Sequence, residues 1–216
     1  LRSGKMVIAS IAPSCSAYFG ASYETLREKI LALKFADAFE TAEGAYLVKS
    51  AYEKLVADHP DQVWISSCCS AVNLLIGKYY PAALPHLAPV LTPIQAHAKF
   101  LKQKYPAAQI AFITPCIAKK AERYSADSLV DYVISFEELE NLIHEAGLAW
   151  KQEFEQAGTQ YLSRKFPTDG GIIATMKRFP GADYVSVSGY TACKQAIQDI
   201  QDKKIAACFV EMSYCE

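Results

Sequence analysis

Short apolar runs alternate along the chain with longer stretches in which apolar residues recur every three or four positions. The short runs are rich in β-branched residues and are bounded by proline, glycine or charged positions, which is typical of buried strands. The longer stretches have the spacing of amphipathic helices. The pattern predicts strands at residues 6–12, 39–41, 63–65, 87–91, 109–114, 132–134, 184–187 and 206–211.

Several helix boundaries carry signals of their own. Ser135 and Glu138 have the spacing of a capping box, and Gly147 follows the last apolar position, so a helix is predicted between them. Pro93 suits the first turn of a helix that reaches about residue 104. Ser22 is a residue type that favours the N-cap of the helix after it. The chain is therefore predicted to alternate strands and helices.

This alternation predicts the α/β class, with mainly parallel sheets flanked by helices. Four of the expected strands precede Tyr105 and four follow it. We therefore expect one domain over residues 1–216, built as two lobes of about residues 1–107 and 108–216, each with a four-stranded sheet. Ligands of open parallel sheets bind beyond the carboxyl ends of the strands, so a site is expected in the cleft between the lobes.

Composition narrows the class of function. The 216 residues carry a net charge of −1, so neither nucleic acid nor an anionic membrane is indicated as a partner. No apolar run reaches the roughly 20 residues that cross a bilayer, and residues 1–5 do not resemble a signal peptide. Seven cysteines is an odd number and too sparse for a disulfide scaffold. Free thiols or metal ligands in a reducing cytoplasm are expected.

Four cysteines share one position in the expected fold, because Cys68 with Cys69, Cys116 and Cys215 each follow a predicted strand. Thiolates brought from three strand ends to one crevice favour zinc or an iron–sulfur cluster. Cysteine is also a common core residue, and the chain has no CxxC pair, so the residues alone leave both interpretations open. The other three cysteines have apolar or helical surroundings and are expected in the core: Cys15, Cys193 and Cys208.

Three segments carry the patterns of one family. Residues 66–87 (SSCCSAVNLLIGKYYPAALPHL), 114–122 (TPCIAKKAE) and 209–216 (FVEMSYCE) resemble, in this order, the three signatures of iron-only, di-iron hydrogenases. Those signatures begin Thr-Ser-Cys-Cys-Pro, Met-Pro-Cys-Thr-x-Lys-Lys-x-Glu and Phe-x-Glu-x-Met-Ala-Cys. Residues 12–14 and 166–171 also match, so the resemblance covers nearly the whole chain. It points to the C-terminal, H-cluster domain of the large subunit.

The resemblance implies a role for each signature. The ligands of a 4Fe-4S cluster would be Cys69, Cys116 and Cys215. Cys68 would carry protons to and from a di-iron unit, and Lys119 would donate a hydrogen bond to a cyanide on that unit. Phe166 and Pro13 would line the cofactor cavity. Without the resemblance, Lys119 and Lys120 would be interpreted as a solvated basic turn. The histidines lie outside the signatures and are expected at the surface or in the core: His59, His86, His97 and His144.

Some signature positions depart from the family's pattern. Ser70 stands where the family has a proline, and Thr114 and Ser213 stand where it has methionines. In the fast enzymes those methionines pack over the di-iron unit. The departures imply a divergent member of the family.

The family's proton path shows a further departure. It uses two glutamates and a serine, and alignment places Glu53, Ser50 and Ala88 at these positions. An interrupted hydrogen-bonded relay slows proton transfer. The expected function is therefore hydrogen or redox sensing with slow hydrogen turnover. Two alternatives stay open: a true hydrogenase, and a non-catalytic 4Fe-4S protein of the same family.

The resemblance also places the ends of this sequence. The family's fourth cluster ligand would fall three residues beyond Glu216, so a domain fragment that stops before the last cysteine of the third signature is expected. In that fragment, purified in air, the cluster is expected to be absent or labile, and the di-iron unit with its carbon monoxide and cyanide ligands is expected only in the longer protein. The resemblance to sensory members of the family also implies ferredoxin-like cluster modules elsewhere in the same chain, which would explain why the sequence starts at Leu1. Hydrogen and protons are the expected partners.

Overall fold

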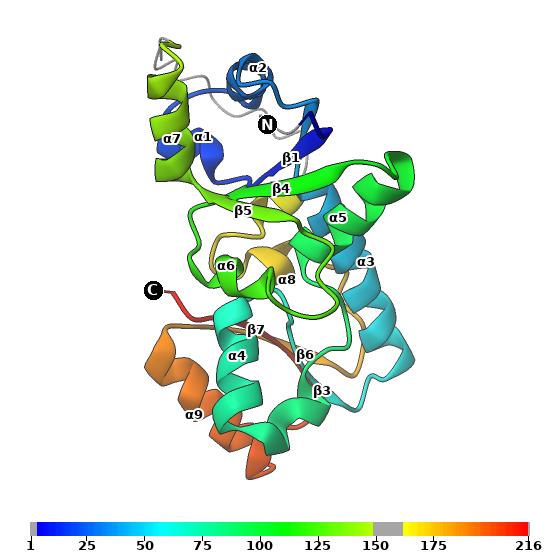
Figure 1. Cartoon of the computed structure of the whole chain (residues 1–216). Coiled ribbons are helices and arrows are strands. Elements are labelled where there is room, and N and C mark those ends of the chain that lie inside the picture. Colours follow the sequence, from blue (N-terminus) through cyan, green and yellow to red (C-terminus); the bar gives the residue numbers. More distant parts are fainter. Residues whose placement is uncertain (1–3, 149–161, 216) are drawn as a thin grey trace. The chain divides into compact units, whose positions relative to one another are not determined.

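The computed structural model describes residues 4–148 and 162–215, which form two compact units (Figure 1). Unit 1 comprises residues 1–44 and 93–164, and unit 2 comprises residues 45–92 and 165–216. These units differ from the expected lobes, 1–107 and 108–216. The reason is strand pairing. The strand at residues 109–114 lies beside the strand at residues 7–11, and the strand at residues 208–213 lies beside the strand at residues 63–65, so each sheet takes strands from both halves of the sequence.

Unit 1 contains a four-stranded sheet in the order β2-β1-β4-β5, and all of its neighbouring strands are parallel. The central strand β1 is buried along its whole length, which explains its continuous apolar run. The strands are β1 (Val7–Ile11), β2 (Asp37–Glu40), β4 (Gln109–Thr114) and β5 (Tyr132–Ser135).

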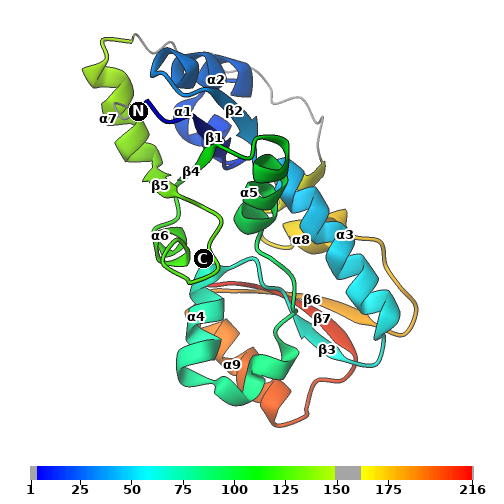
Figure 2. The ribbon, with the colours of Figure 1, turned by 45° about the vertical axis from the view of Figure 1, so that its right-hand side comes forward.

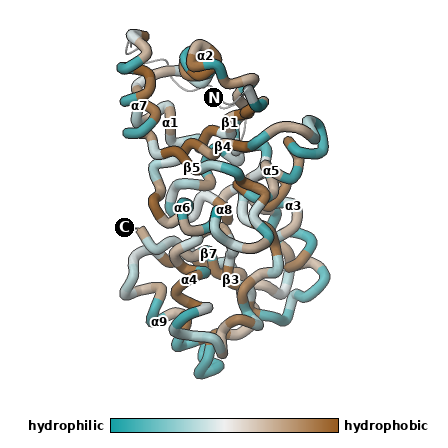
Figure 3. Tube along the Cα trace, viewed as in Figure 1, coloured by the Kyte–Doolittle hydropathy of each residue, from teal (hydrophilic) through white to brown (hydrophobic). Residues whose placement is uncertain are grey.

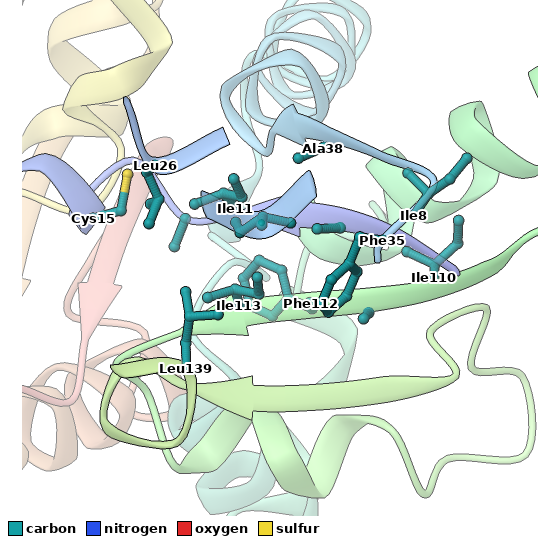
Figure 4. Packing of buried hydrophobic residues seen from close by; sticks show 14 of the residues in the cluster. Ile8, Ile11, Cys15, Leu26, Phe35, Ala38, Ile110, Phe112, Ile113 and Leu139 are labelled. Atoms are coloured by element: carbon teal, nitrogen blue, oxygen red, sulfur yellow. The ribbon is translucent and has the colours of Figure 1, made fainter. Parts of the chain in front are cut away.

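In unit 1, α2 packs against β2, α5 packs against β1 and β4, and α7 packs against β4 and β5. The core between helices and sheet includes Ile11, Leu26 and Leu139 (Figure 4). The helices are α1 (Cys15–Phe19), α2 (Tyr23–Ala32), α5 (Pro93–Lys104), α6 (Ala118–Glu122) and α7 (Phe136–Glu145). A 3-10 helix, η2 (Leu162–Lys165), ends this unit.

The expected helix caps of unit 1 are confirmed. The Ser22 hydroxyl accepts the Thr25 N–H at 3.1 Å. Ser135 and Glu138 form the complete capping box, with distances of 3.1 and 2.7 Å. Gly147 has φ +67°, the left-handed conformation that ends a helix at low cost only with glycine.

Unit 2 contains a three-stranded parallel sheet in the order β3-β7-β6. The strands are β3 (Val63–Ile65), β6 (Asp183–Ser188) and β7 (Cys208–Ser213). The prediction of a further strand at residues 87–91 was wrong. Only Leu87 bridges to Ile65, because Pro89 has no N–H to continue a ladder.

Helices cover both faces of the unit 2 sheet. One face packs against α4 (Ser70–Tyr79) and α9 (Tyr190–Gln201) (Figure 2). On the other face Phe209 meets Tyr52 of α3 (Ala42–Asp58), with ring centroids 5.0 Å apart. Most residues of β3 and β7 are apolar (Figure 3). The unit also contains η1 (Pro81–His86) and α8 (Gly171–Thr175). No helix in the described residues combines the length and apolar character that crossing a membrane requires.

Candidate functional site

The segment from Ser66 to Cys69 leaves β3 at the carboxyl edge of the unit 2 sheet. Its first residue is fixed to β7 twice: the Ser66 N–H donates to Val210 O at 2.9 Å, and the Ser66 hydroxyl accepts the Met212 N–H at 3.1 Å. The segment ends where Cys69 becomes the N-cap of α4. The cysteine pair therefore sits between a pinned strand end and a helix start.

Cys68 faces the α3 side of the sheet. Its Sγ lies 3.3 Å from the hydroxyl of Tyr52, a side chain with no solvent exposure. The same hydroxyl accepts the Ser67 N–H at 2.7 Å and lies 2.8 Å from Ser67 Oγ. Ser67 Oγ in turn donates to Val90 O at 2.7 Å. The buried Tyr52 hydroxyl thus contacts both the Ser67 backbone and the Cys68 thiol.

Cys69 faces the opposite side of the sheet. Its side chain packs against the core beneath α4 and α9, which includes Val72, Cys193 and Met212. The thiol makes no capping hydrogen bond to α4. Neighbouring residues in extended backbone point to opposite faces, and the structure shows this for Cys68 and Cys69. The two adjacent thiols therefore lie in different environments, and each can have a different role.

Cys215 follows the carboxyl end of β7, the strand beside β3, and is exposed. Because parallel strands end at one edge, Cys69 and Cys215 belong to the same edge of this sheet. Just before Cys215, the carbonyl of Ser213 accepts the Cys193 thiol at 3.2 Å.

The three cysteines expected in the core are buried there, so that expectation is confirmed. Burial is the largest cause that raises the pKa of their thiols, to about 11 in each case. They therefore stay protonated at neutral pH, unlike a metal-binding thiolate. These residues are Cys15, Cys193 and Cys208.

Unit 1 carries the second-signature residues between β4 and α6. The half-buried Cys116 donates its N–H to Thr114 Oγ1 at 3.1 Å. Lys119, in α6, pairs with Glu122 at 3.0 Å, and their side chains are only 12% and 11% exposed. Such shielding does not fit a solvated basic turn. Lys120, by contrast, forms a more exposed pair with Glu138 at 2.6 Å.

Phe166 lies half-buried in the turn that joins η2 to α8. Backbone bonds from Thr168 and Gly171 close this turn. A side chain at Gly171 would overlap the carbonyl oxygen of Lys165, so glycine is required. Pro13 is also half-buried, in the turn after β1 of unit 1.

Glu211 ties α8, which follows the Phe166 turn, to β7, a role that the sequence pattern did not indicate. Its buried carboxylate accepts the Ile173 N–H at 2.8 Å. Burial raises the pKa of this carboxyl, and backbone N–H groups at the start of α8 partly oppose the rise. Tyr52 was likewise missed as a site residue, because its position on an apolar helical stripe indicated only core packing.

Two of the residues aligned with the family's proton path form hydrogen bonds within unit 2. Ser50 donates to Tyr46 O at 3.0 Å, within α3. Glu53 pairs with Lys49 at 3.0 Å and accepts the Lys177 N–H at 2.7 Å. Ala88 is buried and has no polar side-chain atom. These groups are held in place as parts of the fold.

The donor set fits a soft metal. Cys69, Cys116 and Cys215 are at least partly accessible, and thiolates are the usual ligands of iron–sulfur clusters. Within either unit, the described residues contain no group of three histidine, cysteine or acidic side chains suited to a metal ion.

Comparison with known proteins finds one matching family and several solved structures of similar fold. The family model "Iron only hydrogenase large subunit, C-terminal domain" matches residues 5–216. A variant of the FeFe-hydrogenase HydA1 from Chlamydomonas reinhardtii has a TM-score of 0.72 at 19% identity, over 98% of this chain and 77% of that chain. HydA(deltaEFG), from a study of stepwise H-cluster assembly, has a TM-score of 0.72 at 17% identity, with the same coverage. No curated protein sequence gave a significant match.

At such identities the solved structures establish the fold, and the family model, which spans nearly all of the chain, establishes the family. The parallel sheets and the three signatures agree with both. The chain belongs to the family of C-terminal domains from the large subunits of iron-only hydrogenases, H-cluster-type hydrogenase domains whose homologues bind iron–sulfur clusters.

Proposed function

We propose that this chain binds a 4Fe-4S cluster through Cys69, Cys116 and Cys215 and serves hydrogen or redox sensing, with slow hydrogen turnover. The observation that carries the proposal is that the side chains of Cys68 and Cys69 point to opposite sides of the unit 2 sheet. Cys69 packs against the core beneath α4 and α9, whereas Cys68 contacts Tyr52 on the other side of the sheet. One thiol can hold a cluster while its neighbour handles protons.

The surroundings of Cys69 suit a thiolate. It caps α4, a ten-residue helix whose N-terminus carries partial positive charge, and this favours a negative ligand. Cys215 extends from the same edge of the sheet, and the N–H bond to Thr114 orients the backbone of Cys116. When bound, the cluster would transfer electrons to or from an attached di-iron unit, which would supply the place where hydrogen is split.

Cys68 and Lys119 would act around that place. Cys68 would hold a proton at Sγ, with the Tyr52 hydroxyl 3.3 Å away to fix the direction of the thiol. Glu122 fixes the direction of the Lys119 ammonium, which would donate to a ligand of the di-iron unit. Phe166 and Pro13 would exclude water.

Slow turnover follows from the residues beyond Cys68. Ala88 cannot relay a proton, and the Ser50 hydroxyl is bound to its own helix. If an ordered water must replace these groups in each cycle at about 3 kcal/mol, the rate falls roughly a hundredfold. A sensor needs an occupied site more than it needs flux. Because Ser50 and Glu53 are both engaged in bonds within the fold, a second candidate is also favoured, a non-catalytic 4Fe-4S protein.

The test combines infrared spectroscopy with hydrogen oxidation on protein prepared with the family's maturation machinery. Bands of iron-bound carbon monoxide and cyanide, with slow oxidation that Cys68→Ser abolishes and Cys15→Ala does not, are expected. Introducing Ala88→Ser with Ser50→Glu should restore part of the rate. Absent bands would favour the non-catalytic candidate. Rates equal to those of the fast enzymes would refute the sensory role.

A further inference from the structure

A chain of hydrogen-bonded polar side chains runs through the interior of unit 1. Ser10 Oγ, in the middle of β1, lies 2.8 Å from Thr41 Oγ1 and 2.8 Å from His97 Nδ1. All three residues are buried, and His97 has no exposed surface. Thr41 directly follows β2, so this end of the chain lies at the carboxyl edge of the unit 1 sheet.

The other ring nitrogen of His97 faces a carboxylate. Nε2 lies 3.4 Å from Glu43 Oε2, and the Glu43 side chain is 37% exposed. The pair is close enough for charge attraction, although its geometry is not that of a hydrogen bond, and Nε2 has no other partner among the described residues. Buried imidazole nitrogens are rarely left unpaired, because desolvation without a bond costs about 1–3 kcal/mol.

The approach of Glu43 to His97 depends on the next residue. A side chain at Gly44 would overlap Pro93 O and would lie 2.6 Å from His97 Cβ. Glycine therefore lets the first turn of α3 contact the first turn of α5. This close contact brings a partly solvated carboxylate to a buried imidazole.

We infer that Glu43, His97, Ser10 and Thr41 form a proton relay between solvent and the carboxyl edge of the unit 1 sheet. The inference rests on the proposed function in one respect, since hydrogen turnover is what would consume or release the protons. Imidazole suits this task because it accepts a proton at one nitrogen and releases another from the second.

The proton balance follows from the contacts. Only the tautomer with hydrogen on Nε2 gives that buried nitrogen a partner, Glu43, and Nδ1 then accepts from the Ser10 hydroxyl. A proton that reaches Thr41 Oγ1 shifts the Thr41 proton to Ser10 and the Ser10 proton to Nδ1. The imidazolium gives its Nε2 proton to the Glu43 carboxylate, which releases it to water. The ring then carries its proton on Nδ1, and the chain returns to its first state when a proton from solvent passes inward, from Glu43 to Nε2, from Nδ1 to Ser10 and from Ser10 to Thr41.

The test is the exchange of the His97 ring proton with water, measured by NMR on the intact 216-residue chain with ¹⁵N-labelled histidine and no cofactor. His97→Gln assigns the signal. We expect the Nε2–H tautomer in the wild type. Glu43→Gln should slow ring-proton exchange at least about tenfold, since an amide cannot act as the base. Glu28→Gln, an exposed glutamate on α2, is the matched control and should leave exchange unchanged.

A His97 that is only a core residue would give a different result. Its exchange would be equal in the Glu43→Gln and Glu28→Gln variants, or its proton would reside on Nδ1, and either outcome would overturn the inference. Thr41→Val, which keeps the shape of the side chain, should leave ring exchange intact because the route to Glu43 remains.

Turnover measurements separate the relay from the proposed function. In matured protein, Thr41→Val and His97→Gln should each lower hydrogen oxidation severalfold without changing the infrared bands. If the wild type shows no turnover while Glu43→Gln still slows exchange, the relay stands and the proposed function fails. If turnover is unaffected by both variants, the relay does not serve the site.

Discussion

The Tyr52 hydroxyl offers a direct test of how the cysteine segment is held. Tyr52→Phe removes one oxygen from a wholly buried side chain and leaves its ring contact with Phe209 in place. The Ser67 N–H, which donates to this oxygen at 2.7 Å, loses its acceptor in a buried position. Ser67 Oγ keeps its bond to Val90 O.

The expected cost follows from these bonds. A buried donor without a partner costs about 1–3 kcal/mol, and the contact with Cys68 adds to the loss. We expect Tyr52→Phe to lower the free energy of unfolding by about 2–3 kcal/mol. For a chain of this size that corresponds to a fall in melting temperature of roughly 4–12 °C.

Urea unfolding followed by tryptophan fluorescence measures this change, because Trp64 lies in β3 of the same unit. Trp150 would be replaced by phenylalanine in every protein compared. Tyr79→Phe is the matched control: its side chain is 63% exposed, and a change under about 0.5 kcal/mol is expected. If Tyr52→Phe also stayed within about 0.5 kcal/mol of the parent, the Tyr52 hydroxyl would not hold the segment.

Three further substitutions test the other contacts. Gly171→Ala should destabilise the chain by several kcal/mol in thermal unfolding, because the new Cβ overlaps Lys165 O; an unchanged melting temperature would contradict this. Arg164→Gln removes the partner of Glu40, whose side chain is 9% exposed, and should cost about 3 kcal/mol in urea unfolding; a loss under about 1 kcal/mol would show that Glu40 is solvated. Glu211 has a raised pKa in the folded state, so folding favours its protonated form. Its stabilising contribution should be complete below the ordinary carboxyl pKa and be lost as pH rises through the raised value. Glu211→Gln should remove this pH dependence, and identical pH profiles for variant and wild type would refute it.

The sequence predicted most of the regular structure because its signals are local. Strand runs such as the one in β4 and the caps at Ser22 and Ser135 depend only on neighbouring residues. The prediction of a strand at residues 87–91 was wrong because an apolar run can also form extended coil. Pro89 has no N–H and cannot continue the hydrogen bonds of a sheet. The lobe boundaries failed because the pairing of β3 with β7 joins residues distant in sequence.

The candidate site divides in the same way. The cysteine positions after strand ends were visible in the sequence, and the signatures gave them roles as predictions. The opposite directions of Cys68 and Cys69 follow from extended backbone. The bond from Tyr52 to Cys68 spans 16 residues, and the link from Glu211 to Ile173 spans 38. Such contacts arise from tertiary packing, which no local pattern encodes.

That Cys69, Cys116 and Cys215 hold one iron–sulfur cluster is tested most directly by iron and sulfide content together with the electron paramagnetic resonance spectrum after anaerobic loading. The wild type and single cysteine-to-serine variants would be compared, with Cys15→Ser as the buried control. One 4Fe-4S cluster per chain is expected in the wild type and the control, with a lost or altered signal in each of the three ligand variants. Full loading and an unchanged spectrum in any one of those three would contradict the shared site.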